Sequence, residues 1–253
     1  MMAFNTLLDE LLVYIFQEVD SSNDLSRVAL CSRRCYDLVL PVLYSSFADE
    51  GRLLRTPPFL ATILRRPRLA QYVKTLAFNA YVFYKYPKWV IDLFNEIQHE
   101  IKAGLSRVCG DDDGEVCEWY NDLHHSPDAI TALVIIFLPN LSTLNLPYYP
   151  GIDDPVYPEY TPRVLSQASR TRTYDVPWPF CLNQLRNLDV GESSLGLCSW
   201  EFVKPLLQLK SLRCLRCSGL SLGDKDINSI EKTTSHITHF ELGLSRISPA
   251  ALV

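Results

Sequence analysis

A six-residue pattern with apolar residues at its first, fourth and sixth positions occurs five times along this chain of 253 residues. Its copies are Val73–Phe78, Leu141–Leu146, Leu185–Val190, Leu212–Cys217 and Ile237–Leu242. Alternation of apolar and polar residues over the last three positions is typical of a β-strand with one buried face. Successive copies begin 68, 44, 27 and 25 residues apart, so the earlier ones are separated by insertions. The pattern predicts one structural unit used repeatedly.

The last two spacings are similar to those of leucine-rich repeats, which this part of the chain resembles. One such repeat cannot bury its apolar face alone, so neighbours stack into a curved solenoid. The resemblance implies an α/β fold over residues 53–253, an irregular solenoid with parallel strands on the concave face and helices outside. Insertions are expected at about 79–138 and 147–180, with helices from Pro87 to Leu105, from Pro127 to Phe137 and over 164–172.

The stretch Ser248–Val253 has the sequence of a helix start that does not continue. A solenoid needs a polar terminal cap, so we expect this array to lack its C-terminal cap. A truncated product and a missing C-terminal portion both stay open.

The first forty-odd residues follow a helical period instead. Apolar side chains spaced for one helix face occur at Leu8, Leu11, Leu12, Ile15, Phe16 and Val19. A second helix is predicted from Asp24 and a third from near Ser32, and Pro41 can start a last helical piece that contains Phe47. Three short helices enclose a small core, so we expect them to dock against something larger.

Three runs of these residues, Leu7–Phe16, Asp24–Tyr36 and Leu38–Tyr44, resemble an F-box of the fungal type, so residues 5–47 are expected to form a three-helix F-box. In that family the F-box binds a Skp-type adaptor, which links it to a cullin–RING (SCF-type) ubiquitin ligase. Two positions depart from the family pattern: Leu8 stands where proline is usual, and Cys35 where a bulky residue is usual. The adaptor contacts that the resemblance implies are Leu7, Leu8, Glu10, Leu11, Ile15, Phe16, Leu25, Val28 and Cys31.

Polar positions of the repeat predict a second contact surface. The fifth-position column reads Ala77, Asn145, Asp189, Arg216 and Glu241, and the third-position column beside it reads Thr75, Thr143, Asn187, Cys214 and His239. Neighbouring strands lie about 4.8 Å apart, so the three charged residues could form a ladder. A solvated sheet face is the alternative. The residues expected to contact a target protein are Asn145, Asn187, Asp189, Arg216, His239 and Glu241.

Sites for metals and for catalysis are not expected. Cys214 and Cys217 with His236 and His239 have zinc-finger-like spacing, but residues three apart along a strand lie on opposite faces. The stretch 191–196 misses the spacing of a nucleophile elbow by one residue. We therefore expect no cofactor, no metal site and no enzyme activity.

Charge and hydropathy limit the partners. Lys and Arg number 24 and Asp and Glu 29, for a net charge of −5, and no basic run suggests nucleic acid or a membrane surface. No apolar run approaches the roughly 20 residues of a membrane helix, and eight cysteines without a signal peptide favour a reducing compartment, cytoplasmic or nuclear. The acidic stretch 110–118 and the Pro- and Tyr-rich stretch 147–162 are expected to be loops, solvated or in contact with a partner.

The functional hypothesis combines both halves of the chain. Residues 5–47 would bind the Skp-type adaptor, and the repeats would present an unknown target protein for ubiquitin-dependent degradation. The alternative is an adaptor-independent scaffold for protein–protein interaction, in which the N-terminal helices only cap the repeats. The identity of the target, and whether its recognition needs a modification, are open at this point.

Overall fold

The computed structural model describes residues 7–49, 54–78, 86–110, 112–147, 160–170, 182–191, 198–222, 235–243 and 245–247. Its N-terminal part is a bundle of three helices, α1 (Asp9–Gln17), α2 (Ser22–Ala29) and α3 (Arg33–Leu43). Serine hydroxyls begin two of them: Ser21 Oγ accepts from the Asp24 N–H and Ser32 Oγ from the Cys35 N–H. The three helices predicted for this segment are confirmed.

A six-stranded parallel sheet runs through the rest of the molecule in the order β1-β2-β3-β4-β6-β8. Its register aligns the fourth position of every predicted copy, from Leu76 through Leu144, Leu188 and Leu215 to Phe240. The repeat predicted from the sequence, with its parallel strands, is therefore confirmed. The strands are β1 (Ser46–Asp49), β2 (Thr75–Phe78), β3 (Thr143–Pro147), β4 (Asn187–Gly191), β6 (Cys214–Ser218) and β8 (His239–Gly243).

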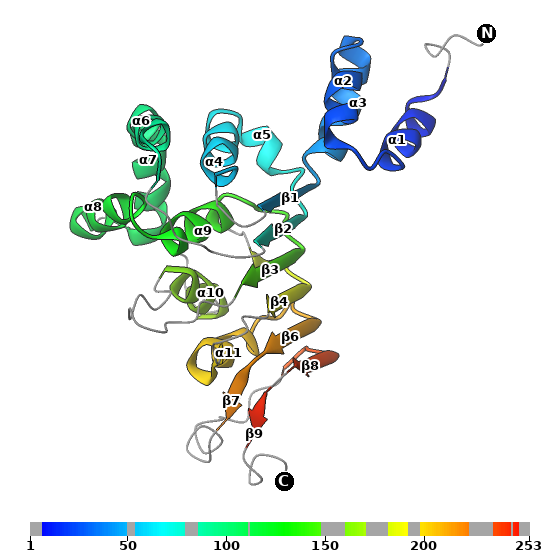
Figure 1. Cartoon of the computed structure of the whole chain (residues 1–253). Coiled ribbons are helices and arrows are strands. Elements are labelled where there is room, and N and C mark those ends of the chain that lie inside the picture. The colour runs from blue at the N-terminus through cyan, green and yellow to red at the C-terminus, as the bar shows by residue number, and fades with distance from the viewer. Residues whose placement is uncertain are drawn as a thin grey trace.

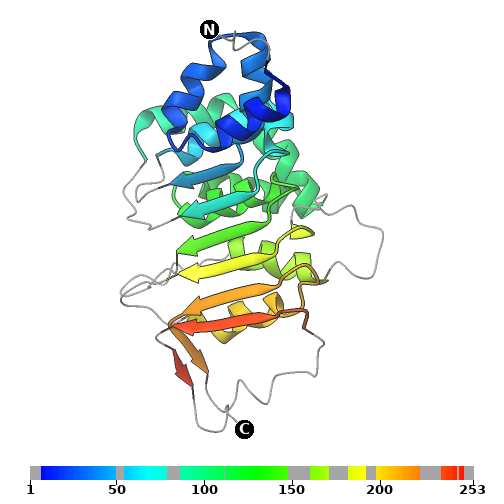
Figure 2. The ribbon, with the colours of Figure 1, turned by 90° about the vertical axis from the view of Figure 1, so that its right-hand side faces the viewer.

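Helices cover one face of this sheet and leave the other open, as Figures 1 and 2 show from two directions. The short helix α5 (Pro67–Ala70) leads into β2. A second, small parallel sheet consists of β5 (Cys198–Ser199), β7 (Leu220–Leu222) and β9 (Arg246–Ile247), and β7 and β9 follow the C-terminal ends of β6 and β8. The covering helices are α4 (Thr56–Arg65), α6 (Lys88–Glu96), α7 (Gln98–Cys109), α8 (Asp113–Asp122), α9 (Pro127–Ile136), α10 (Tyr160–Arg170) and α11 (Trp200–Leu206).

Apolar repeat positions form the core between sheet and helices. The first-position residues Val73, Leu141, Leu185 and Leu212 are all fully buried. Burial weakens at the last strand, where Phe240 is 46% exposed although it occupies the same position as the buried Leu144. Burial of such side chains from water is the main stabilising contribution to an array of this kind.

Strand β1 is a further copy of the repeat that the sequence pattern conceals. The helical piece expected through Phe47 is wrong, because α3 includes Pro41 and ends at Leu43. Phe47 instead lies in β1, in register with Leu76, and its ring stacks on that of Phe59 with centroids 4.0 Å apart. The sheet therefore begins at Ser46. The copy escapes notice because an acid, Asp49, stands at its sixth, apolar position.

Asp49 is only 2% exposed, and its carboxylate is used to start helix α4. One oxygen accepts from the Arg55 N–H at 3.2 Å, from the Thr56 N–H at 2.9 Å and from the Thr56 hydroxyl at 2.6 Å. Amide groups at a helix start lack partners within the helix, so this carboxylate joins strand β1 to the helical layer.

We expect Asp49→Ala to lower the free energy of unfolding by about 1–3 kcal/mol, because it leaves buried donors without their acceptor. Urea denaturation followed by circular dichroism measures this loss. Asp92→Ala, on an exposed position of α6, is the matched control and should cost about 0.5 kcal/mol or less. Equal costs for the two substitutions would contradict the capping role.

Two other expectations need correction. The single helix expected from Pro87 to Leu105 is divided at Ile97 into α6 and α7. The acidic stretch 110–118 is largely helical, since Asp112 Oδ1 accepts from the Glu115 N–H and starts α8. Acidic side chains in a first helical turn also interact favourably with the helix dipole. Most of 147–162 lies outside the described residues, as does Ser248–Val253.

The helical bundle joins the sheet through a connection of two residues, Tyr44 and Ser45. The Tyr44 side chain packs against the large core, and the Ser45 carbonyl accepts from the N–H groups of Lys74 and Thr75 at 2.8 and 3.0 Å. The bundle also has a small core of its own, formed by Leu12, Phe16, Leu25 and Val39. It is thus anchored to the first strands without sharing their core.

Candidate functional site

Helix α1 carries apolar residues on both of its sides, and only one side is covered. Leu12 and Phe16 are 1% and 2% exposed and lie in the bundle core. Arg34 of α3 fixes the helix, donating from Nε at 2.8 Å and from Nη2 at 2.5 Å to Asp9 Oδ1. The other side of α1 faces solvent.

Four residues form this outer side, which we name the α1 surface: Leu8, Leu11, Tyr14 and Ile15. They are 66%, 49%, 64% and 43% exposed, respectively. Several large apolar side chains exposed together are typical of an interaction site, whereas single ones are ordinary. Tyr14 was not predicted, although its spacing of three from Leu11 could have indicated it.

The other residues expected to contact an adaptor are placed differently. Glu10 and Cys31 are exposed, and Leu7 and Val28 are half-buried against the bundle core. Phe16 and Leu25 are buried in that core, so they support the α1 surface from behind and contribute little accessible area to it. The structure thus brings Leu8, Leu11 and Ile15 together and separates Phe16 and Leu25 from them.

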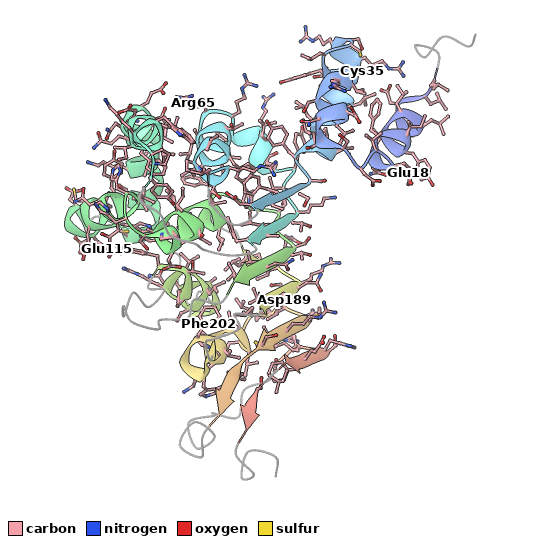
Figure 3. All side chains as sticks on the ribbon, viewed as in Figure 1. Glu18, Cys35, Arg65, Glu115, Asp189 and Phe202 are labelled. Atoms are coloured by element: carbon pink, nitrogen blue, oxygen red, sulfur yellow. The ribbon has the colours of Figure 1, made fainter. Side chains whose placement is uncertain are left out.

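The open face of the sheet carries the second predicted surface. Its fifth-position residues are in register as expected, from Ala77 through Asn145, Asp189 and Arg216 to Glu241. Figure 3 shows Asp189 on the sheet, whereas Phe202 and Glu115 lie in the helical layer.

Part of the expected charge ladder is present on this face. Arg216 Nε lies 2.8 Å from Glu241 Oε2, with both side chains more than half exposed. In the third-position column, Asn187 Nδ2 donates to Thr143 Oγ1 at 3.2 Å, and His239 is exposed. Exposed pairs of this kind add little stability, on the order of 0–1 kcal/mol, so their contribution would lie in selecting a partner.

Asp189 is the most enclosed charge on the open face. Partial burial raises the pKa of its carboxyl group; Arg216 opposes this shift and Glu241 adds to it. Its charged form is therefore less favourable in the folded chain than in the unfolded one.

The raised pKa of Asp189 makes the free energy of unfolding depend on pH. The folded chain holds the Asp189 proton more tightly than the unfolded chain, so stability falls as pH rises through the range of ordinary carboxyl groups. We expect Asp189→Asn to be more stable than the parent at pH 7, with the difference vanishing below a pH of about 3.9. Urea denaturation over this pH range measures the difference, with Asp92→Asn as the same-charge control. A difference that does not change with pH would contradict this account.

The four residues with zinc-finger-like spacing do not converge on one face. Cys217 is 1% exposed in an apolar position of the repeat, Cys214 is half-buried, and His236 and His239 are exposed. Within the described part of the chain, no group of three or more His, Cys, Asp or Glu side chains could hold a metal ion.

Comparison with known families matches most of the chain. A profile of the leucine-rich repeat domain matches residues 51–251, which include β2, β3, β4, β6 and β8 together with the helical layer. A search of curated proteins finds no match to the chain. Across the described residues, no helix has the length and apolar character needed to cross a membrane.

Proposed function

The chain belongs to the leucine-rich repeat domain family, whose fold implies a protein-interaction role, and from this premise we propose that it is a non-catalytic substrate receptor of a cullin–RING (SCF-type) ubiquitin ligase. The three-helix bundle would be an F-box of the fungal type that docks a Skp-type adaptor. The open face of the sheet would hold the target protein. Ubiquitin transfer itself would be carried out by other subunits.

The observation that carries this proposal is the α1 surface. Neither the bundle core nor the large core covers Leu8, Leu11 and Ile15, although the same helix buries Leu12 and Phe16. Exposed apolar side chains on a helix fixed by the Arg34–Asp9 ion pair suit a protein partner that removes them from water. Glu10 beside them supplies a charge at the rim of such an interface.

The short connection between bundle and sheet supports a receptor role. Tyr44 and Ser45 bond and pack into the sheet, so a target on the open face would keep a fixed position relative to the adaptor. A ligase acts by proximity, because tethering raises the effective concentration of target lysines near the charged ubiquitin carrier. A rigid connection serves this purpose better than a flexible one.

The Cys109 thiol is unsuited to act as a catalytic nucleophile. Burial, together with a hydrogen bond to Glu115 and the charge of that carboxylate, raises the pKa of the Cys109 thiol to about 12. A catalytic cysteine needs the opposite shift, because the thiolate is the nucleophile.

Co-expression of the full chain with a Skp-type adaptor tests the proposal. We expect the two proteins to co-purify and to elute together on size exclusion. Failure to form this complex, while the repeats still bind a partner protein, would favour the adaptor-independent scaffold instead. In that case the bundle would serve as the N-terminal cap that a solenoid needs.

A further inference from the structure

The residues that immediately precede the strands form a continuous ladder along one edge of the sheet. Along the ladder from Lys74 through Ser142, Arg186 and Arg213 to Thr238, each residue after the first donates its backbone N–H to the carbonyl of the one before, at 2.8 Å. These backbones are therefore direct neighbours, although the residues are far apart in sequence. We name this region, with the turns that lead into it, the strand-start edge; it lies at the tails of the arrows in Figure 2.

Four basic side chains lie on the strand-start edge. Arg186 and Arg213 occupy adjacent rungs, and both side chains are exposed. Lys74 is exposed two rungs from Arg186, and Lys210 is exposed in the turn before β6, where its carbonyl accepts from Arg213 Nη1 at 2.7 Å. The like charges of two arginines on neighbouring rungs repel each other, which costs stability unless an anion lies between them.

Carboxylates are missing from the same region. The described turns before the strands, 71–74, 140–142, 183–186, 210–213 and 235–238, contain no Asp or Glu. The ion pairs formed among the described residues use five other arginines, so the four cations of this edge have no carboxylate partner there. Those five are Arg27, Arg34, Arg65, Arg163 and Arg216.

The positive charge of this edge is opposite in sign to the net charge of the protein. The chain has a net charge of −5, so described turns that hold four cations and no acid are a local reversal of sign. A surface of one sign attracts and orients a partner of the other sign.

We propose that the strand-start edge binds an acidic segment, rich in Asp and Glu, of the target protein. An extended segment places every second side chain on one side at intervals of about 6.6 Å, close enough to the rung spacing of about 4.8 Å for its carboxylates to reach successive cations. Nucleic acid is the less suitable polyanion, because single strands are bound by exposed aromatic side chains. Of the Phe, Tyr and Trp residues, the described turns of this edge contain Tyr72 alone, and its side chain is half-buried.

This inference depends on the proposed function in one respect: it assumes that the acidic segment belongs to the target protein of the ligase. The strand-start edge and the α1 surface share no residue, so the two ideas can fail separately. The variant Arg186→Glu plus Arg213→Glu should therefore still co-purify with the Skp-type adaptor.

A fluorescein-labelled peptide of ten glutamates, titrated with the full chain and followed by anisotropy, tests the inference directly. We expect binding at 50 mM salt that weakens at 500 mM, where screening reaches only a few ångströms. Arg186→Glu plus Arg213→Glu should weaken binding at least about tenfold. Arg27→Glu plus Arg33→Glu, which makes the same change of net charge on exposed residues of the bundle, should leave it within about twofold.

Three results would overturn the inference: absence of peptide binding at low salt, equal loss in both double variants, or tighter binding of a ten-nucleotide single-stranded DNA than of the peptide. Circular dichroism of each variant establishes that its fold is retained. If the adaptor co-purifies with the parent chain while the peptide does not bind, this inference fails and the proposed function stands.

Discussion

Replacing Leu11 and Ile15 together by aspartate should abolish binding of the full chain to a Skp-type adaptor, lowering the affinity at least about a hundredfold. Residues that dominate an interface cost about 2 kcal/mol or more each when they are lost, and two such losses exceed a factor of a hundred. Aspartate adds to this cost, because an interface that buries a carboxylate without a partner must also desolvate it. Isothermal titration calorimetry with purified adaptor measures the change.

The bundle should fold normally in this double variant. Leu11 and Ile15 are 49% and 43% exposed, while the bundle core depends on Leu12, Phe16, Leu25 and Val39. Leu54→Asp plus Trp89→Asp is the matched control, since these side chains are 38% and 47% exposed outside the bundle, and it should leave adaptor binding unchanged. Adaptor binding as tight as that of the parent chain in the Leu11 and Ile15 variant would contradict the docking role of the α1 surface.

The sheet could be predicted from the sequence because its signal is local and repeated. Positions one, four and six fix which side chains are buried, and the alternation between them fixes which face the open side, so the register of Asn145, Asp189 and Arg216 followed directly. Strand β1 could not be found this way. Its buried Asp49 interrupts the apolar pattern, and the helix start at Thr56 that this acid serves becomes visible only in three dimensions.

Helix boundaries in the insertions were less predictable. Val90, Phe94, Ile97, Ile101 and Leu105 are all fully buried and keep one helical period through the break at Ile97, so the pattern could not reveal two helices. The acidic stretch was misinterpreted for a related reason. A cluster of Asp and Glu is typical of a solvated loop, but the same residues suit a capped first turn, as in α8.

The residues that form the two candidate surfaces could not all be identified from the sequence, because exposure depends on how the elements pack. The same helical spacing fits two pairs of residues, Leu11 with Ile15 and Leu12 with Phe16. Only packing in three dimensions decides which pair stays exposed. The strand-start edge was not predicted, although Lys74, Arg186 and Arg213 all occupy the second position of the repeat. Lys74, Arg186 and Arg213 come from three separate segments, so no basic run exists until the sheet aligns them.

The second large effect concerns the core of the repeats, where one position occurs both buried and exposed. Leu144 in β3 and Phe240 in β8 both occupy the fourth position of the repeat, and their side chains are 0% and 46% exposed. We expect Leu144→Ala to lower the free energy of unfolding by about 2–5 kcal/mol, because the removed methyl groups leave a cavity between sheet and helices.

Phe240→Ala removes a larger side chain and should nevertheless cost about 1 kcal/mol or less, because much of that ring is already in contact with water. Urea denaturation followed by circular dichroism compares the two variants. A larger loss for Phe240→Ala than for Leu144→Ala would mean that the ring is covered in solution, and the open end of the sheet would then be an interface. Under native conditions Leu144→Ala should still bind the Skp-type adaptor, because the bundle core is separate from the core that this substitution weakens.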